Sequence, residues 1–295
     1  MIGHLKITSP WKQFALLIIV SLPLLVLTML DTGSGSKIDL TKPGVVDSLK
    51  WSQVFASIAF FFLPAFLYAA FTFRSRQFYF LGFKKPEKAT MYILSGIIAL
   101  IAMPAVFWLG QLNQMLPIPE TLRKMEQEAG KTMEALQRIN SPKDIFVNLF
   151  IIAVVPGICE EVYFRGALQR VLINVTKSPW AGIILTGLLF SALHFQFLGF
   201  IPRTFLGIVL GALYWYSGSL WTAIISHFVI NAVQVIAIAY APKYVNENPH
   251  MPLMYAMISL TAVTVIIWYF KRNSNITWSR VYGVNDLNST NQFIA

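Results

Sequence analysis

The chain has 295 residues, of which 56% are hydrophobic and 12% are charged, and its formal net charge is +10 at pH 7. Soluble domains contain about 25% charged and about 45–50% apolar residues, so this composition excludes a soluble globular enzyme. A single cysteine, Cys159, excludes a disulfide scaffold as well. The sequence therefore predicts an all-α, polytopic membrane protein.

Apolar segments recur along the whole chain. A helix needs about 20 apolar residues to cross the hydrocarbon core of a bilayer. We expect eight transmembrane helices, at residues 12–30, 51–73, 90–112, 145–173, 179–198, 202–217, 219–240 and 252–270. The first segment follows Lys6 and Lys12 but has no small-residue cleavage site, which favours a retained helix over a signal peptide.

The basic residues lie mainly in short loops between these segments, as Arg74, Arg76 and Lys88 illustrate. This placement is typical of membrane proteins and does not indicate nucleic-acid binding. Its asymmetry favours both chain ends in the cytoplasm, and we expect an integral protein of a bacterial cytoplasmic (inner) membrane whose main partner is the lipid bilayer.

The positions of these segments divide the chain into four predicted parts. Three N-terminal transmembrane helices with polar loops occupy residues 1–112, an amphipathic segment follows at 113–144, a helical core at 145–240, and a last helix with a polar tail at 241–295. In the second part, apolar residues recur at three- and four-residue steps from Leu122 to Ile139. We expect an interfacial helix there, with a lid over a membrane-embedded site as the alternative.

Ionisable side chains inside the predicted spans are concentrated in the core. They are Glu160, Glu161 and Arg165 in the fourth span, His194 in the fifth, and His227 with Asn231 in the seventh. Such residues are costly in a bilayer and mark function by default. Glu160 and His194 lie at similar distances from the turn near Lys177, so antiparallel packing would bring them to one depth.

Proline and glycine residues near these side chains predict local features of the helices. Pro156 and Gly157 precede the two glutamates and predict a kink or a break in the fourth span. Gly207 and Gly211 are four residues apart in the sixth span, which favours close helix packing.

These residue types suit hydrolysis. A carboxylate and an imidazole facing one cavity can position and deprotonate a water molecule, while a second imidazole and an amide can stabilise an oxyanion. Glu161 and Arg165 have the i, i+4 spacing of a helical ion pair, which serves either as structural support or in the chemistry.

Three motifs then point to a known family. Residues 160–166 match EExxxR followed by glycine, Phe190 to His194 match FxxxH, and His227 to Asn231 match HxxxN. In this order, across roughly residues 145–240, the chain resembles the CPBP (CAAX protease and bacteriocin-processing, or Abi) intramembrane proteases, which are related to type II CAAX prenyl endopeptidases.

The resemblance implies roles for the motif residues. Glu160 and His194 would activate the hydrolytic water, His227 and Asn231 would stabilise the oxyanion, and Glu161 and Arg165 would support Glu160. Glu160, His194 and His227 are also a donor set that zinc accepts. Because no HExxH motif is present and the same side chains suffice for acid–base chemistry, we expect no firm cofactor, with zinc as the alternative.

The resulting hypothesis is an intramembrane endopeptidase acting on a membrane-associated or hydrophobic peptide. Two alternatives come from other classes. A proton-coupled transporter also uses intramembrane carboxylates and histidines, although we find no internal repeat in the sequence. A non-catalytic immunity or scaffold protein would keep the same fold without the chemistry.

Overall fold

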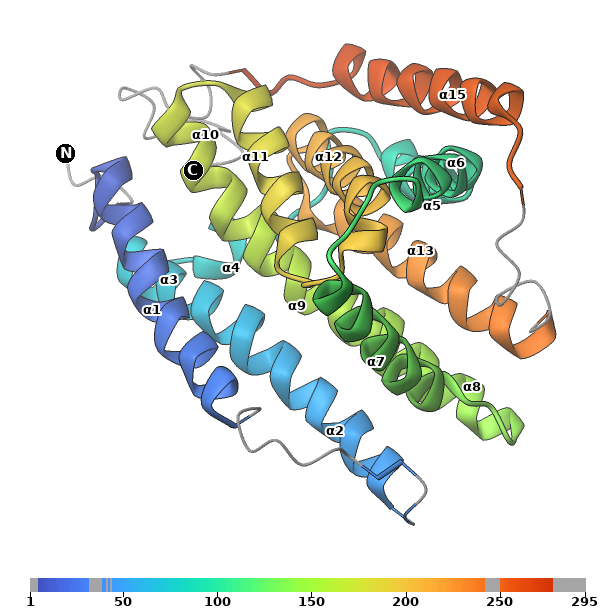
Figure 1. The fold of residues 1–295 in the computed structure, drawn as a ribbon. Helices are drawn as coiled ribbons and strands as arrows, with labels where there is room; N and C mark the ends of the chain where they lie inside the picture. The colour runs from blue at the N-terminus through green and yellow to red at the C-terminus, as the bar shows by residue number, and fades with distance from the viewer. Residues whose placement is uncertain (1–4, 32–38, 41, 43, 242–249, 278–295) are drawn as a thin grey trace.

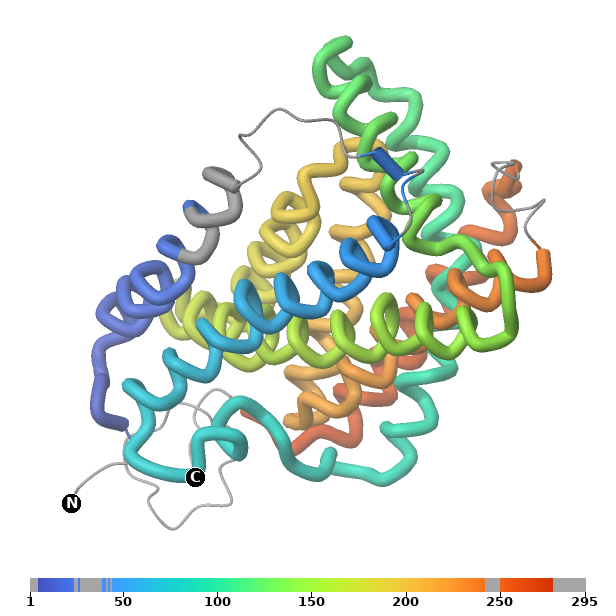
Figure 2. The backbone as a smooth tube through the Cα atoms, turned by 90° about the horizontal axis from the view of Figure 1, so that it is seen from below, coloured from blue at the N-terminus to red at the C-terminus, as the bar shows by residue number. Residues whose placement is uncertain are grey.

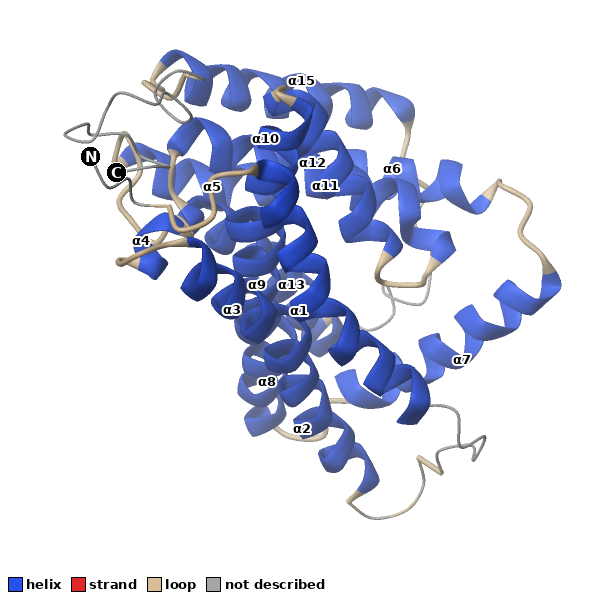
Figure 3. Cartoon of the chain, turned by 90° about the vertical axis from the view of Figure 1, so that its left-hand side faces the viewer, coloured by secondary structure: helices blue, strands red, loops and turns tan. Residues whose placement is uncertain are grey.

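A computed structural model describes residues 5–31, 39, 40, 42, 44–241 and 250–277 of the chain. Within these residues the structure is helical, and its only β-type pairing is an isolated bridge between Leu5 and Phe73. Figure 3 shows this all-helical character for the same part of the chain. The all-α prediction is therefore confirmed, whereas most of the predicted polar tail, from residue 278 onward, lies outside the described residues.

Five helical segments are long and apolar enough to cross a membrane: Val45–Thr72, Pro142–Thr176, Phe197–Ser217, Leu220–Tyr240 and Leu253–Arg272. A sixth crossing is available if helices α5 (Thr90–Ile101) and α6 (Met103–Gln114), bent by 40°, form one span. Two apolar helical stretches are shorter, Pro10–Pro23 within α1 (Pro10–Asp31) and α11 (Pro179–Ala192). All eight lie where the sequence predicts spans, and length together with apolar composition makes five of them candidate crossings.

The fourth predicted span is the central element of the molecule (Figure 1). Its consecutive elements are α8 (Pro142–Asn148), the π-helical η3 (Leu149–Val154), α9 (Val155–Glu161), the π-helical η4 (Val162–Gln169) and α10 (Arg170–Thr176). Of the kink or break predicted at Pro156, the break is absent, because the helical segment continues through this residue. The π turn directly before Pro156 shifts the hydrogen-bond register, which accommodates a residue without an N–H.

Other helices surround this central element (Figures 1 and 2). The N-terminal helices contact one side of it: α1, α2 (Val45–Ser57), η2 (Ile58–Phe62) and α3 (Leu63–Thr72). Helices α11, α12 (Phe200–Ser217) and α13 (Leu220–Tyr240) contact it as well, while α5, α6 and α15 (Leu253–Arg272) pack against α12 and α13. The short α4 (Gln77–Phe80) follows α3.

The outward faces of many helices carry large apolar side chains, among them Ile19, Ile93, Ile258 and Trp268, each more than half exposed. Apolar surface of this extent suits contact with lipid. Together with the apolar spans, it identifies an integral membrane protein.

The predicted amphipathic helix is present as α7 (Glu120–Gln137). It contacts α2 and the short 3-10 helix η5 (Phe197–Gly199), and the Glu126 carboxylate accepts a hydrogen bond of 3.0 Å from the Leu198 N–H. Helix α7 therefore connects the N-terminal helices to the segment that follows His194. Its location at the membrane interface stays a prediction.

Candidate active site

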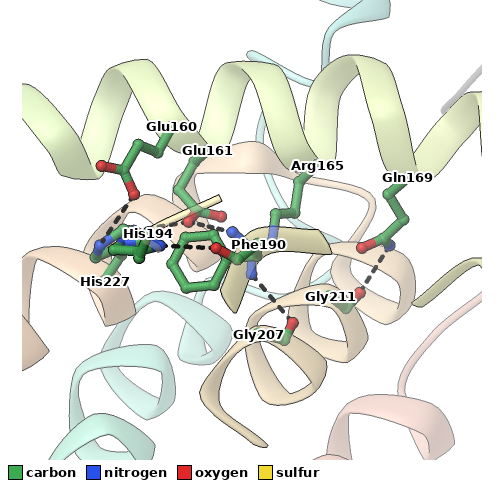
Figure 4. A network of polar contacts seen from close by, with 9 residues as sticks. All are labelled: Glu160, Glu161, Arg165, Gln169, Phe190, His194, Gly207, Gly211 and His227. Atoms are coloured by element: carbon green, nitrogen blue, oxygen red, sulfur yellow. Dashed lines mark hydrogen bonds and ion pairs between the residues drawn. The ribbon is translucent and has the colours of Figure 1, made fainter. Parts of the chain in front are cut away.

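Glu161 is at the centre of a buried polar network (Figure 4). Its side chain is inaccessible to solvent, and its Oε1 atom lies 2.6 Å from Nη1 of Arg165, which is equally buried. The predicted i, i+4 ion pair is thus present. A second Arg165 nitrogen, Nη2, donates a hydrogen bond of 3.1 Å to the Gly207 carbonyl on α12. The guanidinium therefore joins the central helix to α12 while it neutralises Glu161.

His227 reaches the same carboxylate from α13. Its Nδ1 atom lies 2.7 Å from Glu161 Oε1, and its Nε2 atom faces Glu160 Oε2 at 4.0 Å. Because an ionised carboxylate only accepts hydrogen bonds, Nδ1 carries the hydrogen in this contact. In this structure Glu161 therefore orients His227 directly, a partnership that the sequence motifs do not reveal.

His194 lies in a turn beyond the end of α11 and is half-buried. The predicted span at 179–198 is too long, since α11 ends at Ala192 and Phe195 adopts a left-handed φ of 52° that cannot continue a helix. The His194 Nδ1 atom lies 2.7 Å from the Phe190 carbonyl oxygen. Since a carbonyl oxygen only accepts, Nδ1 is the protonated nitrogen, and Nε2 of a neutral ring is left as a proton acceptor.

Phe190 contributes more than its carbonyl. The centroid of its ring is 5.0 Å from the centroid of the His194 ring and 5.8 Å from that of His227, and the Arg165 guanidinium carbon lies 4.8 Å from it. One aromatic ring therefore contacts both imidazoles and the Arg165 guanidinium. The motif FxxxH contains this residue, but its spacing alone does not reveal the double contact.

Asn231 shares α13 with His227 but is not part of this network. Its Nδ2 atom donates a hydrogen bond of 3.0 Å to the carbonyl of Ile152 on η3. The structure thus brings Glu160, Glu161, Arg165 and His227 together. It places the Phe190 ring against both His194 and His227, and it engages the Asn231 amide elsewhere on the central helix.

Both glutamates retain hydrogen-bonding capacity. The Oε2 atoms of Glu160 and Glu161 are buried and have no hydrogen-bond partner among the described residues. Buried acceptors normally find a partner, so a water molecule or a substrate N–H would be well accommodated there. Glu160, with 8% of its surface exposed, is the more accessible of the two.

The grouping of possible metal donors bears on the zinc alternative. No group of three histidine, cysteine, aspartate or glutamate side chains in the described parts of the chain is arranged to hold a metal ion. The alternative donor set for zinc, Glu160, His194 and His227, is no exception. The expectation of no firm cofactor, with zinc as the alternative, stays a prediction.

Gln169 extends the network by one helical turn beyond Arg165. It is fully buried, and its Nε2 atom donates a hydrogen bond of 3.0 Å to the Gly211 carbonyl. Arg165 and Gln169 thus reach carbonyls that are four residues apart on α12 (Figure 4). Sequence analysis missed Gln169, although its i, i+4 spacing from Arg165 was an available signal.

Comparison with known proteins concerns this same region. Residues 142–233 match the family described as type II CAAX prenyl endopeptidase Rce1-like, and this range contains every residue of the network. The uncharacterized protein YpbD of Bacillus subtilis (strain 168) is 29% identical over 127 residues, which cover 42% of this chain and only 59% of YpbD. No solved structure matches the chain. The family match confirms the resemblance that the three motifs predict.

Proposed function

We propose that the chain, which over residues 142–233 matches the Rce1-like type II CAAX prenyl endopeptidases, is an intramembrane endopeptidase that cleaves a membrane-associated or hydrophobic peptide. The observation that carries the proposal is the buried contact of His227 with both glutamates, 2.7 Å from Glu161 and 4.0 Å from Glu160. Charged groups in a membrane-spanning core are costly to keep, which favours a functional reason for them.

Glu160 and His194 are the proposed activators of water. The Glu160 carboxylate, or the free Nε2 of His194, accepts one proton as the water oxygen attacks the carbonyl carbon of the scissile bond. The same proton then passes to the leaving nitrogen as the C–N bond breaks, so that a carboxylic acid and an amine are formed. Each group has an atom that can accept this proton. Glu160 Oε2 makes no hydrogen bond, and the bond from His194 Nδ1 to the Phe190 carbonyl leaves Nε2 of His194 without a hydrogen.

His227 is the proposed donor to the oxyanion. With Nδ1 bound to Glu161, a protonated ring presents its Nε2–H toward the side on which Glu160 lies. Protonated His227 and Arg165 would balance the two glutamates, so the four groups would be neutral in sum. Charge pairing of this kind lowers the cost of burial, and a preorganised donor stabilises developing negative charge.

The substrate is proposed from the membrane setting and the family. A peptide segment that reaches the site from the lipid must itself be hydrophobic or be anchored to the membrane. The family's description names a CAAX prenyl endopeptidase. Cleavage of prenylated CAAX proteins is therefore one hypothesis for this chain. The similarity to a Bacillus protein supports placement in a bacterial cytoplasmic membrane.

The test is a cleavage assay on detergent-purified protein with a peptide library read by mass spectrometry, including prenylated and unprenylated forms of one peptide. We expect the wild type to cleave and His194→Gln to lose activity by about 10²–10⁴-fold, the usual contribution of a general base. Cleavage that survives a chelator is expected; loss on chelation with recovery on adding Zn²⁺ would instead assign the same donors to a metal.

Failure to cleave any peptide by folded wild type would contradict the proposal. A pH-gradient-driven flux in proteoliposomes, lost in Glu161→Gln, would then support the transporter alternative. A cellular phenotype that persists in Glu160→Ala and His194→Ala would support a scaffold.

A further inference from the structure

The proposed base His194 lies on the connection between two helices. Helix α11 ends at Ala192 and α12 begins at Phe200, so residues 193–199 lack the continuous hydrogen bonding of an α-helix. The backbone reverses at Phe195, which has a φ of 52°. Backbone groups of such a connection need partners from other elements, and a side chain on it is only as well placed as those partners hold it.

Asn113, on α6, binds this connection where it joins α12. Its Nδ2 atom donates a hydrogen bond of 2.7 Å to the Phe197 carbonyl, and its Oδ1 atom accepts one of 2.7 Å from the Ile201 N–H. The side chain is only 2% exposed, so water does not compete for these contacts. Because the donor and the acceptor of an asparagine amide are different atoms, the pair of contacts fixes the orientation of the amide.

The start of α12 has no cap of its own. Its N-cap residue is Gly199, which has no side chain and makes no side-chain capping bond. The first N–H groups of a helix have no partner within the helix, and Ile201 is the second residue of α12. The Glu126 carboxylate on α7 binds a different group, the Leu198 N–H. Asn113 therefore acts as a helix cap supplied by another helix.

We propose that Asn113 is a positioning residue for His194: by binding Phe197 and Ile201 it holds the end of the connection, and thereby keeps the His194 imidazole against Phe190 in the site. The effect on catalysis rests on the proposed function. The effect on the connection itself can be measured without any activity.

The first experiment is hydrogen exchange of the full-length protein in detergent, followed by mass spectrometry of peptides that cover residues 193–203. Asn113→Leu should speed exchange there by about tenfold, because the Ile201 N–H loses its acceptor, and should leave peptides from α13 unchanged. Asn113→Asp keeps an acceptor for Ile201 but loses the donor to Phe197, and should have a smaller effect; it serves where the leucine variant does not fold. Unchanged exchange in a folded variant would overturn the proposal.

The second experiment is a double-mutant cycle with His194→Gln, read by kcat and KM on a cleaved peptide. Asn113→Leu alone should lower kcat on the order of 10²-fold through a misplaced base while KM stays unchanged. In the His194→Gln background it should lower kcat by less than about threefold, because the group that it positions is already absent. Equal losses in both backgrounds would contradict the proposal. If the wild type cleaves no peptide, the proposed function fails, and hydrogen exchange still decides whether Asn113 holds the connection.

Gln13 on α1 provides a matched control. It is also 2% exposed, and its amide also uses both ends: Nε2 donates to the Ile7 carbonyl at 2.8 Å, and Oε1 accepts from the Tyr68 hydroxyl at 3.0 Å. Neither contact involves residues 193–203. Gln13→Leu should therefore lower Tm but leave both kcat and exchange of that segment unchanged. If it lowers kcat and speeds exchange as much as Asn113→Leu does, the effect is general destabilisation and the proposal is wrong.

Discussion

Each glutamate of the pair has a different environment, although the two are adjacent in sequence. Glu161 is fully buried and contacts both Arg165 and His227. Glu160 Oε2 makes no hydrogen bond and lies 4.0 Å from His227 Nε2. The sequence predicts the Glu161–Arg165 pair, because both residues lie on one helix. It does not predict the His227 contact, which joins residues 66 positions apart.

Removal of the charge at Glu161 should destabilise the protein more than the same change at Glu160. Glu161→Gln leaves the Arg165 guanidinium buried without its counter-ion, a defect that costs about 3–5 kcal/mol in proteins. Glu160→Gln leaves that pair intact and should change Tm by less than a third as much. Thermal unfolding of both variants in detergent measures the difference, and equal Tm losses would contradict the assignment of Glu161 as the structural partner.

Helix packing beside the site depends on close backbone approach. A Cβ atom on Gly207 would lie 2.8 Å from the Gly187 Cα atom, so α11 and α12 touch through their backbones near the point where Gly207 receives the Arg165 hydrogen bond. The spacing of Gly207 and Gly211 predicts this contact. The length of α11 was not predictable from hydropathy, because the apolar run continues past Ala192 while the backbone turns at Phe195.

Gly207→Ala should lower stability, since the clash is with backbone that cannot rotate away; overpacking of this kind costs about 1–3 kcal/mol. Gly130→Ala on α7 is the matched control, because its Cβ meets no atom within 4 Å and alanine favours helix by about 0.5–1 kcal/mol. Thermal unfolding should therefore move in opposite directions for the two variants. A stable Gly207→Ala protein would show that the contact is looser than described.

The whole molecule places its site in one continuous part of the chain, between Pro142 and Tyr240. The three motifs predict most of that site, because each lies within one helix or turn and its residue types are unusual in apolar segments. Hydrogen bonds from these side chains to backbone carbonyls could not be predicted from the motifs. The Phe190 carbonyl fixes the His194 tautomer and the Ile152 carbonyl binds Asn231, and neither contact requires a particular side chain at those positions.

If all eight predicted segments cross the membrane, the side on which each loop lies follows from their order. Lys177 follows the fourth segment and Lys271 lies at the end of the eighth, so both should lie on one side, while Lys131 on α7 lies between the third and fourth segments and should face the other. Cysteines introduced at these exposed positions in a Cys159→Ala background can be labelled with a membrane-impermeant maleimide in oriented vesicles. Labelling of Lys131→Cys from the same side as Lys177→Cys would exclude this topology.

The most direct measurement is the ratio of kcat between wild type and Glu160→Gln on one cleaved peptide, with Tm recorded for both proteins. We expect kcat to fall by about 10²–10⁴-fold while Tm changes little, because Glu160 is the proposed base and has no hydrogen-bond partner on Oε2. Undiminished kcat in a folded Glu160→Gln protein would contradict the assignment of Glu160 as the group that activates water.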